Sequence, residues 1–230
     1  MSYPGSKAQA GTWQRIIGQM PPHRIYVEAF AGSAQVFLRK RRAAINVLIE
    51  RDPAVSADLD ARIRGAAVLN GDALIELAAP ELDLGDTITL TLGDDALVYC
   101  DPPYLLETRR NRRYYEHELS DEQHRQLLAL LQGLKCKVML SGYPSELYGT
   151  ALQNWRCLSY QTRTRGRTLT ECLWMNFEEP AALHDWRYTG RTYRERQSLS
   201  KLRRRWLARL QRMTARHRGF ILDAIAQRQF

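Results

Sequence analysis

Two hydrophobic spacings alternate along the first 180 residues of this chain, one typical of buried strands and the other of amphipathic helices. Short apolar runs predict strands at 24–30, 44–49, 66–70, 96–100 and 138–141. Apolar residues at helical spacing predict helices at 13–20, 33–41, 53–64 and 120–134. The alternation favours an α/β sheet with crossover helices, and it predicts two βαβ crossovers in succession between 24 and 70.

The pattern changes in the last third of the chain. Two more strands, at 157–161 and 171–177, flank an arginine-rich turn and predict a closing hairpin. Apolar residues on one face then predict a basic amphipathic helix at 201–218. We expect a main domain at 1–184, with a cofactor half at about 1–80 and a catalytic half at about 94–180, and a basic helical extension at 185–230.

The positive charge of the chain lies almost wholly in this extension. Residues 185–230 contain 13 Lys and Arg against three acidic residues, whereas residues 1–184 contain 21 against 22. A basic block of this kind attracts polyanions, nucleic acid first and an acidic membrane surface second. A solvated basic helix without a partner is the alternative.

Neither an export segment nor a membrane span is predicted. The first residues are polar and turn-forming, and no apolar run reaches the length that crosses a bilayer. The cysteines at 100, 136, 157 and 172 are far apart, with no Cys-x-x-Cys pair. They are typical of reduced core thiols in a cytoplasmic protein.

The strongest chemical signal is the tetrapeptide Asp101-Pro102-Pro103-Tyr104, directly after an apolar strand. Open α/β sheets bind their ligands at this end of the strands. A plain turn that ends the strand would explain the prolines, but neither the carboxylate nor the aromatic ring.

These four residues suit chemistry on an aromatic amine, whose lone pair is delocalised into its ring. The Asp101 carboxylate and the Pro102 carbonyl can accept hydrogen bonds from the two N–H groups, and Pro103 helps to fix the direction of that carbonyl. The same acceptors stabilise positive charge that grows on the nitrogen during alkylation. Tyr104 offers a flat surface for an extruded base.

A second signal lies at the ends of the first three predicted strands. The first strand runs into the small-residue turn Ala31-Gly32-Ser33, which lets a nucleoside approach the backbone. Glu50 ends the second strand, where a carboxylate can accept from ribose hydroxyls, and Asp52 competes for this role. Asp72 ends the third strand and could accept from a cofactor's adenine amine. Each acid taken alone is more often a helix cap or a solvated turn residue, but three such strand ends in register favour the cofactor roles.

Together these motifs resemble those of the Dam-type adenine-specific DNA methyltransferases, including shorter phage and prophage members. The resemblance rests on residues 3–7, 30–34, 101–104, 140–143 and 170–174, and it covers roughly residues 3–177. It implies a Rossmann-like fold with helices on both faces of the sheet and S-adenosylmethionine as methyl donor, with S-adenosylhomocysteine as product and no metal. It also implies that Lys7 contacts the cofactor and that Phe30 packs on it.

The sequence departs from the family pattern in two ways. Ser6 and Ala34 stand where many members have Gly, which affects how tightly the cofactor would be held. Longer members of the family also have a sizeable DNA-recognition region inserted before the catalytic motif. In this chain only 28 residues separate Asp72 from Asp101. DNA must therefore be read by other parts of the chain.

Three basic segments are candidates for DNA contact, because arginines bind phosphate and aromatic rings stack on bases. The first lies just beyond the motif, the second at the tip of the predicted hairpin, and the third on the extension. Their residues are Arg109, Arg110, Arg112, Arg113 and Tyr114; Arg163, Arg165 and Arg167; and Arg203, Arg204 and Arg205. A solvated surface is the alternative for each.

The sequence thus predicts transfer of a methyl group from S-adenosylmethionine to the 6-amino group of a flipped adenine in double-stranded DNA, by a monomer or weak dimer. An enzyme acting on cytosine in DNA or adenine in RNA is one alternative, and Asp101 speaks against cytosine because the cytosine enzymes commonly have Ser there. A catalytically silent DNA-binding protein is the other alternative.

Overall fold

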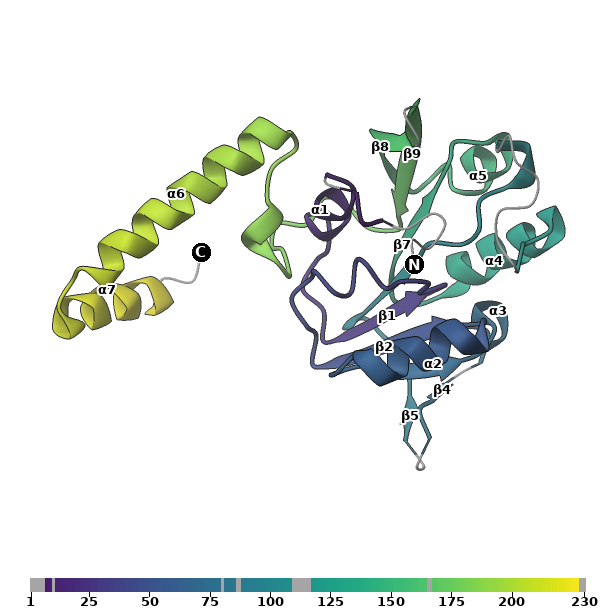
Figure 1. Ribbon diagram of the computed structural model, residues 1–230, viewed down its shortest axis with the longest axis horizontal. Helices are drawn as coiled ribbons and strands as arrows, with labels where there is room; N and C mark the ends of the chain where they lie inside the picture. Colours follow the sequence, from purple (N-terminus) through teal and green to yellow (C-terminus); the bar gives the residue numbers. More distant parts are fainter. Residues whose placement is uncertain are drawn as a thin grey trace. The chain divides into compact units, whose positions relative to one another are not determined.

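A computed structural model describes residues 7–9, 11–79, 81–85, 88–108, 117–164 and 167–227 (Figure 1). The chain divides into two compact units, Met1–Asp185 and Trp186–Phe230. The division lies one residue from the position where the composition changes. Among the described residues, no helix is both long and apolar enough to cross a membrane.

A seven-stranded sheet forms the centre of the first unit. Its strands, in chain order, are β1 (Ile25–Ala29), β2 (Ile45–Glu50), β3 (Ala67–Asn70), β6 (Ala96–Cys100), β7 (Lys137–Gly142), β8 (Arg156–Thr164) and β9 (Arg167–Met175). They lie in the order β3-β2-β1-β6-β7-β9-β8, and β9 is antiparallel to both β7 and β8. The predicted strands and the closing hairpin are confirmed. A small separate ladder pairs β4 (Leu82–Asp83) with β5 (Thr89–Leu90).

Successive side chains of the strands point to opposite faces of the sheet and are apolar on both. Helices therefore cover both faces. The helices of this unit are α1 (Thr12–Ile17), α2 (Pro53–Arg62), α3 (Ala73–Glu76), α4 (Asp121–Gly133) and α5 (Glu146–Ala151), with a 3-10 turn η1 (Leu106–Thr108). One core cluster joins Val27, Val98 and Leu140 to α3, α4 and α5. The opposite faces of the strands, with Tyr26 and Leu48, are buried on the side of α1 and α2.

The strand order places the chain's candidate chemistry at one edge. β1 pairs in parallel with both β2 and β6, and it is the strand from which the chain winds outward in both directions. The carboxyl ends of β1, β2, β6 and β7 therefore lie side by side. Ligands of open α/β sheets bind at such a switch point.

The helix predicted at 33–41 is wrong, and the chain there makes a series of turns. Phe30 and Ala34 adopt positive φ angles of 58° and 50°, which are incompatible with a continuing right-handed helix. The Phe37 amide donates to the buried carboxylate of Glu28 at 2.8 Å. A contact with the sheet thus replaces a helical hydrogen bond, and the first crossover contains no helix.

The second unit contains η2 (Trp186–Tyr188), α6 (Tyr193–Gln211) and α7 (Ala215–Gln227). The single helix predicted at 201–218 is wrong in both bounds. The Thr192 side chain accepts from the Glu195 amide and begins α6 early, and the Thr214 hydroxyl accepts from the His217 amide at the start of α7. Hydroxyl side chains at these positions favour new helix starts. No described side chain of α6 or α7 is buried.

The expectation that all four cysteines are core thiols is wrong for one of them. Cys100, Cys136 and Cys172 are buried, but Cys157 is exposed on β8, the edge strand of the sheet. The alternate residues Cys157, Ser159 and Gln161 of β8 are all exposed, so one face of this strand is open to solvent there.

Candidate active site

The motif Asp101–Tyr104 begins where β6 ends, at the centre of the sheet edge. All five residues of β6 are buried, and the Asp101 amide donates to the Ala29 carbonyl at 3.4 Å, continuing the pairing with β1. Pro102 and Pro103 have no N–H and cannot extend the ladder further. The chain therefore leaves the sheet at Asp101, with the carboxylate held at the switch point.

Lys7 lies against this motif, 94 residues away in the sequence. Its ammonium group donates to Asp101 Oδ1 at 2.7 Å and also to the Tyr104 hydroxyl. The Tyr104 hydroxyl in turn donates to Asp101 Oδ1 at 3.3 Å. The family resemblance implied a cofactor contact for Lys7, and the structure adds a direct contact with Asp101 and Tyr104.

A second carboxylate, Glu171 of β9, completes the cluster. Glu171 Oε1 lies 4.0 Å from the Lys7 ammonium nitrogen, and the Tyr160 hydroxyl of β8 donates to Glu171 Oε2 at 3.2 Å. The side chains of Lys7 and Glu171 are 5% and 8% exposed, and that of Asp101 is 19% exposed. One cation thus faces two carboxylates in a largely buried site, and Asp101 is the more accessible of the two.

The electrostatics of the cluster follow from this burial. Desolvation lowers the pKa of Lys7, but the Asp101 and Glu171 carboxylates outweigh it, so the net pKa lies above its ordinary value. Burial raises the pKa of Asp101, although the adjacent Lys7 ammonium acts in the opposite direction. Burial and the nearby carboxylates also raise the pKa of the Tyr104 and Tyr160 hydroxyls. Lys7 therefore remains charged and both tyrosines remain neutral at physiological pH.

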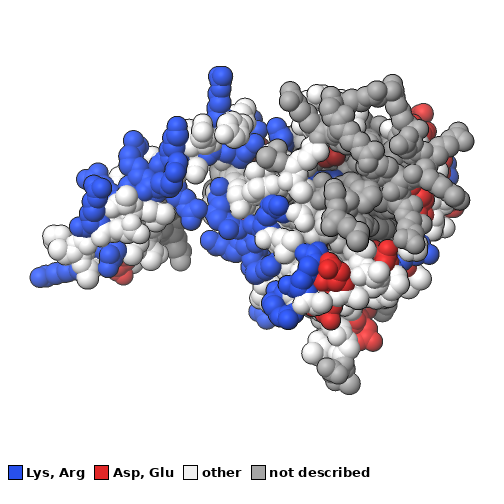
Figure 2. Space-filling view, viewed as in Figure 1, with Lys and Arg blue, Asp and Glu red and all other residues white. Residues whose placement is uncertain are grey.

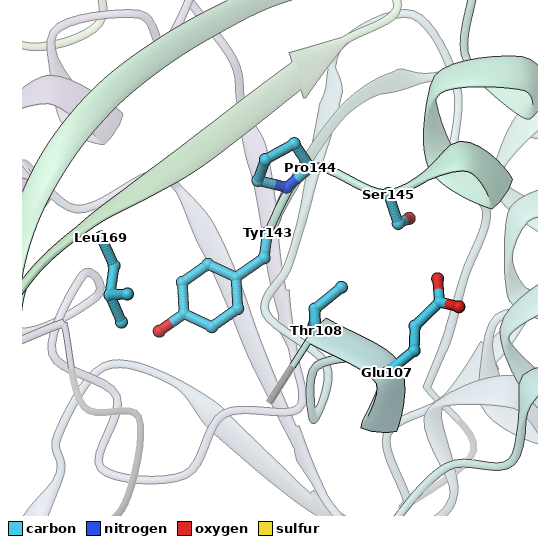
Figure 3. Close-up of a pocket in the computed structure, with 6 residues that line it drawn as sticks. All are labelled: Glu107, Thr108, Tyr143, Pro144, Ser145 and Leu169. Carbon is cyan, nitrogen blue, oxygen red and sulfur yellow. The ribbon is translucent and has the colours of Figure 1, made fainter. Parts of the chain in front are cut away.

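Tyr143, directly after β7, adds a second aromatic ring to the site. Its ring meets that of Tyr104 edge-on, with 4.4 Å between the centroids. Tyr143 also lines a pocket of about 420 Å³ (Figure 3) together with Glu107, Thr108, Pro144, Ser145 and Leu169. The pocket adjoins the motif through this ring, although Asp101 and Tyr104 do not line it.

Glu50 is the best placed of the predicted cofactor residues. It ends β2, it is 6% exposed, and its carboxylate accepts from the Gly32 amide at 2.7 Å and the Asp52 amide at 2.9 Å. Each carboxylate oxygen can accept a second hydrogen bond, so the group keeps capacity for a ligand hydroxyl. The bond to Gly32 also joins Glu50 to the turn of Ala31, Gly32 and Ser33. Phe30, at the head of that turn, is partly exposed.

Asp52 and Asp72 both act as helix caps. Asp52 Oδ1 accepts from the Ala54 and Val55 amides at the start of α2. Asp72 Oδ1 accepts from the Leu74 amide at the start of α3, and Asp72 Oδ2 lies 3.4 Å from Arg51 Nη1. These contacts are the alternative considered from the sequence, and the cofactor role of both residues stays a prediction.

Three site residues were not singled out by sequence reasoning: Glu171, Tyr160 and Tyr143. Glu171 and Tyr143 do lie in the segments that carry the family resemblance, which was the available signal. Their proximity to Lys7 and Tyr104 depends on the antiparallel pairing of β9 with β7 and β8, which brings Cys172 opposite both Gly142 and Ser159.

The structure locates the candidate DNA contacts only in part. Arg203, Arg204 and Arg205 lie on α6 and are exposed. Figure 2 shows basic side chains gathered over the pair of helices α6 and α7. Arg163 and Arg167 belong to β8 and β9, but their side chains are outside the described set. Arg109, Arg110, Arg112, Arg113, Tyr114 and Arg165 lie outside the described residues. Among those described, no group of His, Cys, Asp and Glu could hold a metal ion.

Comparisons with solved structures find distant likenesses. The provisionally assigned methyltransferase yhhF from Escherichia coli is 20% identical, with 69% of this chain and 78% of that one covered and a TM-score of 0.41. The magnesium protoporphyrin IX methyltransferase ChlM from Synechocystis, solved with S-adenosylmethionine bound, is 14% identical, with 72% and 75% covered and a TM-score of 0.42.

A third likeness extends over nearly the whole chain. TrmK of M. capricolum, solved with S-adenosylhomocysteine, is 7% identical over 95% of both chains, with a TM-score of 0.48. No curated protein sequence matches the chain. The strand order of the sheet, β3-β2-β1-β6-β7-β9-β8, is itself that of a Rossmann-like fold.

A family model gives the more specific result. It matches residues 82–165, which run from β4 through β8 and include Asp101–Tyr104, Tyr143 and Tyr160. The matched family is described as D12 class N6 adenine-specific DNA methyltransferase. The predicted resemblance to the adenine-specific DNA methyltransferases is therefore confirmed for the segment that contains Asp101–Tyr104.

Proposed function

We propose that this protein transfers a methyl group from S-adenosylmethionine to the exocyclic 6-amino group of adenine in DNA. One observation carries the proposal: the Asp101 carboxylate lies at the switch point of the sheet, partly accessible, within the segment that matches the adenine-specific family. The other groups of the site fit the same chemistry.

The residues at the β1 and β2 ends suit a nucleoside cofactor. Glu50 is a buried carboxylate at a strand end with spare acceptor capacity, and the neighbouring turn has only a methyl side chain at Ala31 and none at Gly32. Phe30 offers a partly exposed ring beside them. These residues would hold the cofactor. When bound, S-adenosylmethionine supplies a methyl carbon on a sulfonium sulfur, which keeps the electron pair of the C–S bond as that bond breaks.

The chain's own residues prepare the attacking nitrogen. Asp101 accepts a hydrogen bond from one N–H of the amine and the Pro102 carbonyl accepts from the other, so the nitrogen lone pair is directed at the methyl carbon. As the N–C bond forms, positive charge grows on the nitrogen beside the Asp101 carboxylate. The methylated nitrogen then loses one proton to water by way of that carboxylate.

The two rings next to the motif suit an extruded base. Tyr104 and Tyr143 meet edge-on; Tyr143 is partly exposed and Tyr104 is 6% exposed, so a base that stacks on Tyr104 must displace groups that now cover it. The adjoining pocket behind Tyr143 has room for part of a flanking nucleotide. Flipping the base out of the duplex is necessary because the amine is otherwise engaged in base pairing.

The direct test uses purified protein and S-adenosylmethionine carrying a labelled methyl group, with unmethylated plasmid DNA in one reaction and total cellular RNA in a parallel reaction. After incubation each nucleic acid is digested to nucleosides and analysed by mass spectrometry. We expect the label in N6-methyladenine. Label in N4-methylcytosine, or label in RNA but not in DNA, would replace the proposed substrate by one of the alternatives.

A further inference from the structure

The cluster of Lys7, Asp101 and Glu171 poses an electrostatic problem for the proposed reaction. Lys7 donates to the same Asp101 oxygen that also receives the Tyr104 hydroxyl, at 2.7 Å and 3.3 Å. A cation this close offsets the negative charge of Asp101. It would also repel the positive charge that develops on the amine nitrogen during methyl transfer.

Glu171 is close enough to Lys7 to pair with its ammonium group in place of Asp101. Its Oε1 lies 4.0 Å from the Lys7 ammonium, so a short side-chain movement would exchange one carboxylate partner for the other. The Glu171 side chain is 8% exposed and is held by the Tyr160 hydroxyl at Oε2, which leaves Oε1 to face Lys7. One ammonium group thus lies within 4.0 Å of two carboxylates.

The less accessible carboxylate is thus well placed for the lysine and the more accessible one for the substrate. Asp101 has a side chain 19% exposed at the end of β6, whereas Glu171 lies within the antiparallel strand β9. Within the part of the chain that the structure describes, the other groups near Lys7 are the phenols of Tyr104 and Tyr143. Among these described neighbours, Glu171 is the carboxylate other than Asp101 that can balance the charge of Lys7.

We propose that Glu171 is a positioning residue that draws the Lys7 ammonium away from Asp101 when the target amine enters, so that Asp101 keeps its charge for the reacting nitrogen. The inference rests on the proposed function. It predicts that the charge of Glu171 affects the methyl-transfer step rather than the binding of DNA.

The test compares Glu171→Gln with wild-type protein in single-turnover methyl transfer, at saturating S-adenosylmethionine and with unmethylated plasmid DNA. We expect the rate to fall on the order of tenfold, because one charge about 4 Å from the lysine is removed from a poorly solvated site. DNA affinity should change less than about twofold. Glu171→Asp, which retains the charge, should recover most of the lost rate.

A matched control separates the charge from the packing. Tyr160→Phe removes the hydroxyl that holds Glu171 but leaves the carboxylate, so its rate should stay well above that of Glu171→Gln. A Tyr160→Phe rate as low as that of Glu171→Gln would overturn the inference, as would a Glu171→Gln rate equal to that of the wild type.

A readout that does not depend on turnover is the titration of the Lys7 ammonium, followed by NMR of ¹⁵N-labelled lysine. In Glu171→Gln the Lys7 titration should move to lower pH, and an unmoved titration would contradict the pairing. An inactive wild-type protein would refute the proposed function and the inference with it. Active wild type with unaffected Glu171 variants would refute the inference alone.

Discussion

The role of Asp101 can be tested by Asp101→Asn, which keeps the shape of the side chain and one acceptor oxygen but removes its charge. A carboxylate within about 4 Å of a developing cation contributes roughly 4 kcal/mol at an effective dielectric constant of about 20. The Asp101 side chain is 19% exposed, and one of its oxygens accepts from Lys7. Solvent and the lysine charge therefore reduce the stabilisation of the transition state by Asp101 to about 3 kcal/mol. This corresponds to a loss of about 100-fold to 1,000-fold in the methyl-transfer rate.

The assay is single-turnover transfer of labelled methyl groups to unmethylated plasmid DNA at saturating cofactor. Cofactor affinity, measured by calorimetry, should fall far less than the rate, because the Glu50 carboxylate is held by the Gly32 and Asp52 amides and does not depend on Asp101, although Lys7 does. Asp58→Asn is the matched control, since Asp58 is an exposed carboxylate on α2 that pairs with Arg62. A rate within about threefold of the wild type, or a defect confined to DNA affinity, would refute the role given to Asp101.

Three further predictions concern the ring, the extension and the fold. Tyr104→Ala should remove a stacking surface and cost about 1–3 kcal/mol of binding to DNA with an abasic site opposite the target adenine; unchanged affinity would exclude stacking. A chain that ends at Asp185 should bind DNA more weakly, with a shallower dependence of log Kd on log salt, and an unaltered slope would show that Arg203–Arg205 do not contact phosphate. Burial lowers the pKa of His23 to about 3, and its Nε2 has no partner among the described residues. The folded protein therefore keeps this ring neutral, whereas the unfolded chain protonates it below its pKa of about 6.5. The free energy of unfolding is thus unaffected by the titration of His23 above that pH and decreases as the pH falls towards 3. By pH 5 the loss should be about 2 kcal/mol in urea unfolding, and His23→Gln should remove this contribution; an equally steep pH dependence in the variant would contradict the assignment.

The strands could be predicted because buried parallel strands leave a continuous apolar run, and each run here is bounded by polar or turn residues. The helix expected at 33–41 could not be excluded from the sequence, since its apolar spacing is helical. What prevents it is a tertiary contact, the bond from the Phe37 amide to Glu28, together with the positive φ angles of Phe30 and Ala34. The spacing of residues alone does not contain that information.

In the candidate site, too, the residues that depend on tertiary contacts could not be predicted from the sequence. Asp101 could be located from the sequence because the motif follows a strand directly. Glu171 could not be assigned a role, because its position beside Lys7 depends on β9 running antiparallel between β7 and β8. For Asp52 and Asp72, the sequence could not separate a ligand role from a helix cap, since both call for a carboxylate after a strand and before a helix.

The most direct test of the account is a crystal structure of the protein with a cofactor analogue and a DNA duplex whose target adenine is extruded. We predict that an Asp101 carboxylate oxygen lies about 3 Å from the 6-amino nitrogen, with that nitrogen facing the position of the transferable methyl group. An adenine bound elsewhere, with its amine out of hydrogen-bonding reach of Asp101, would contradict it.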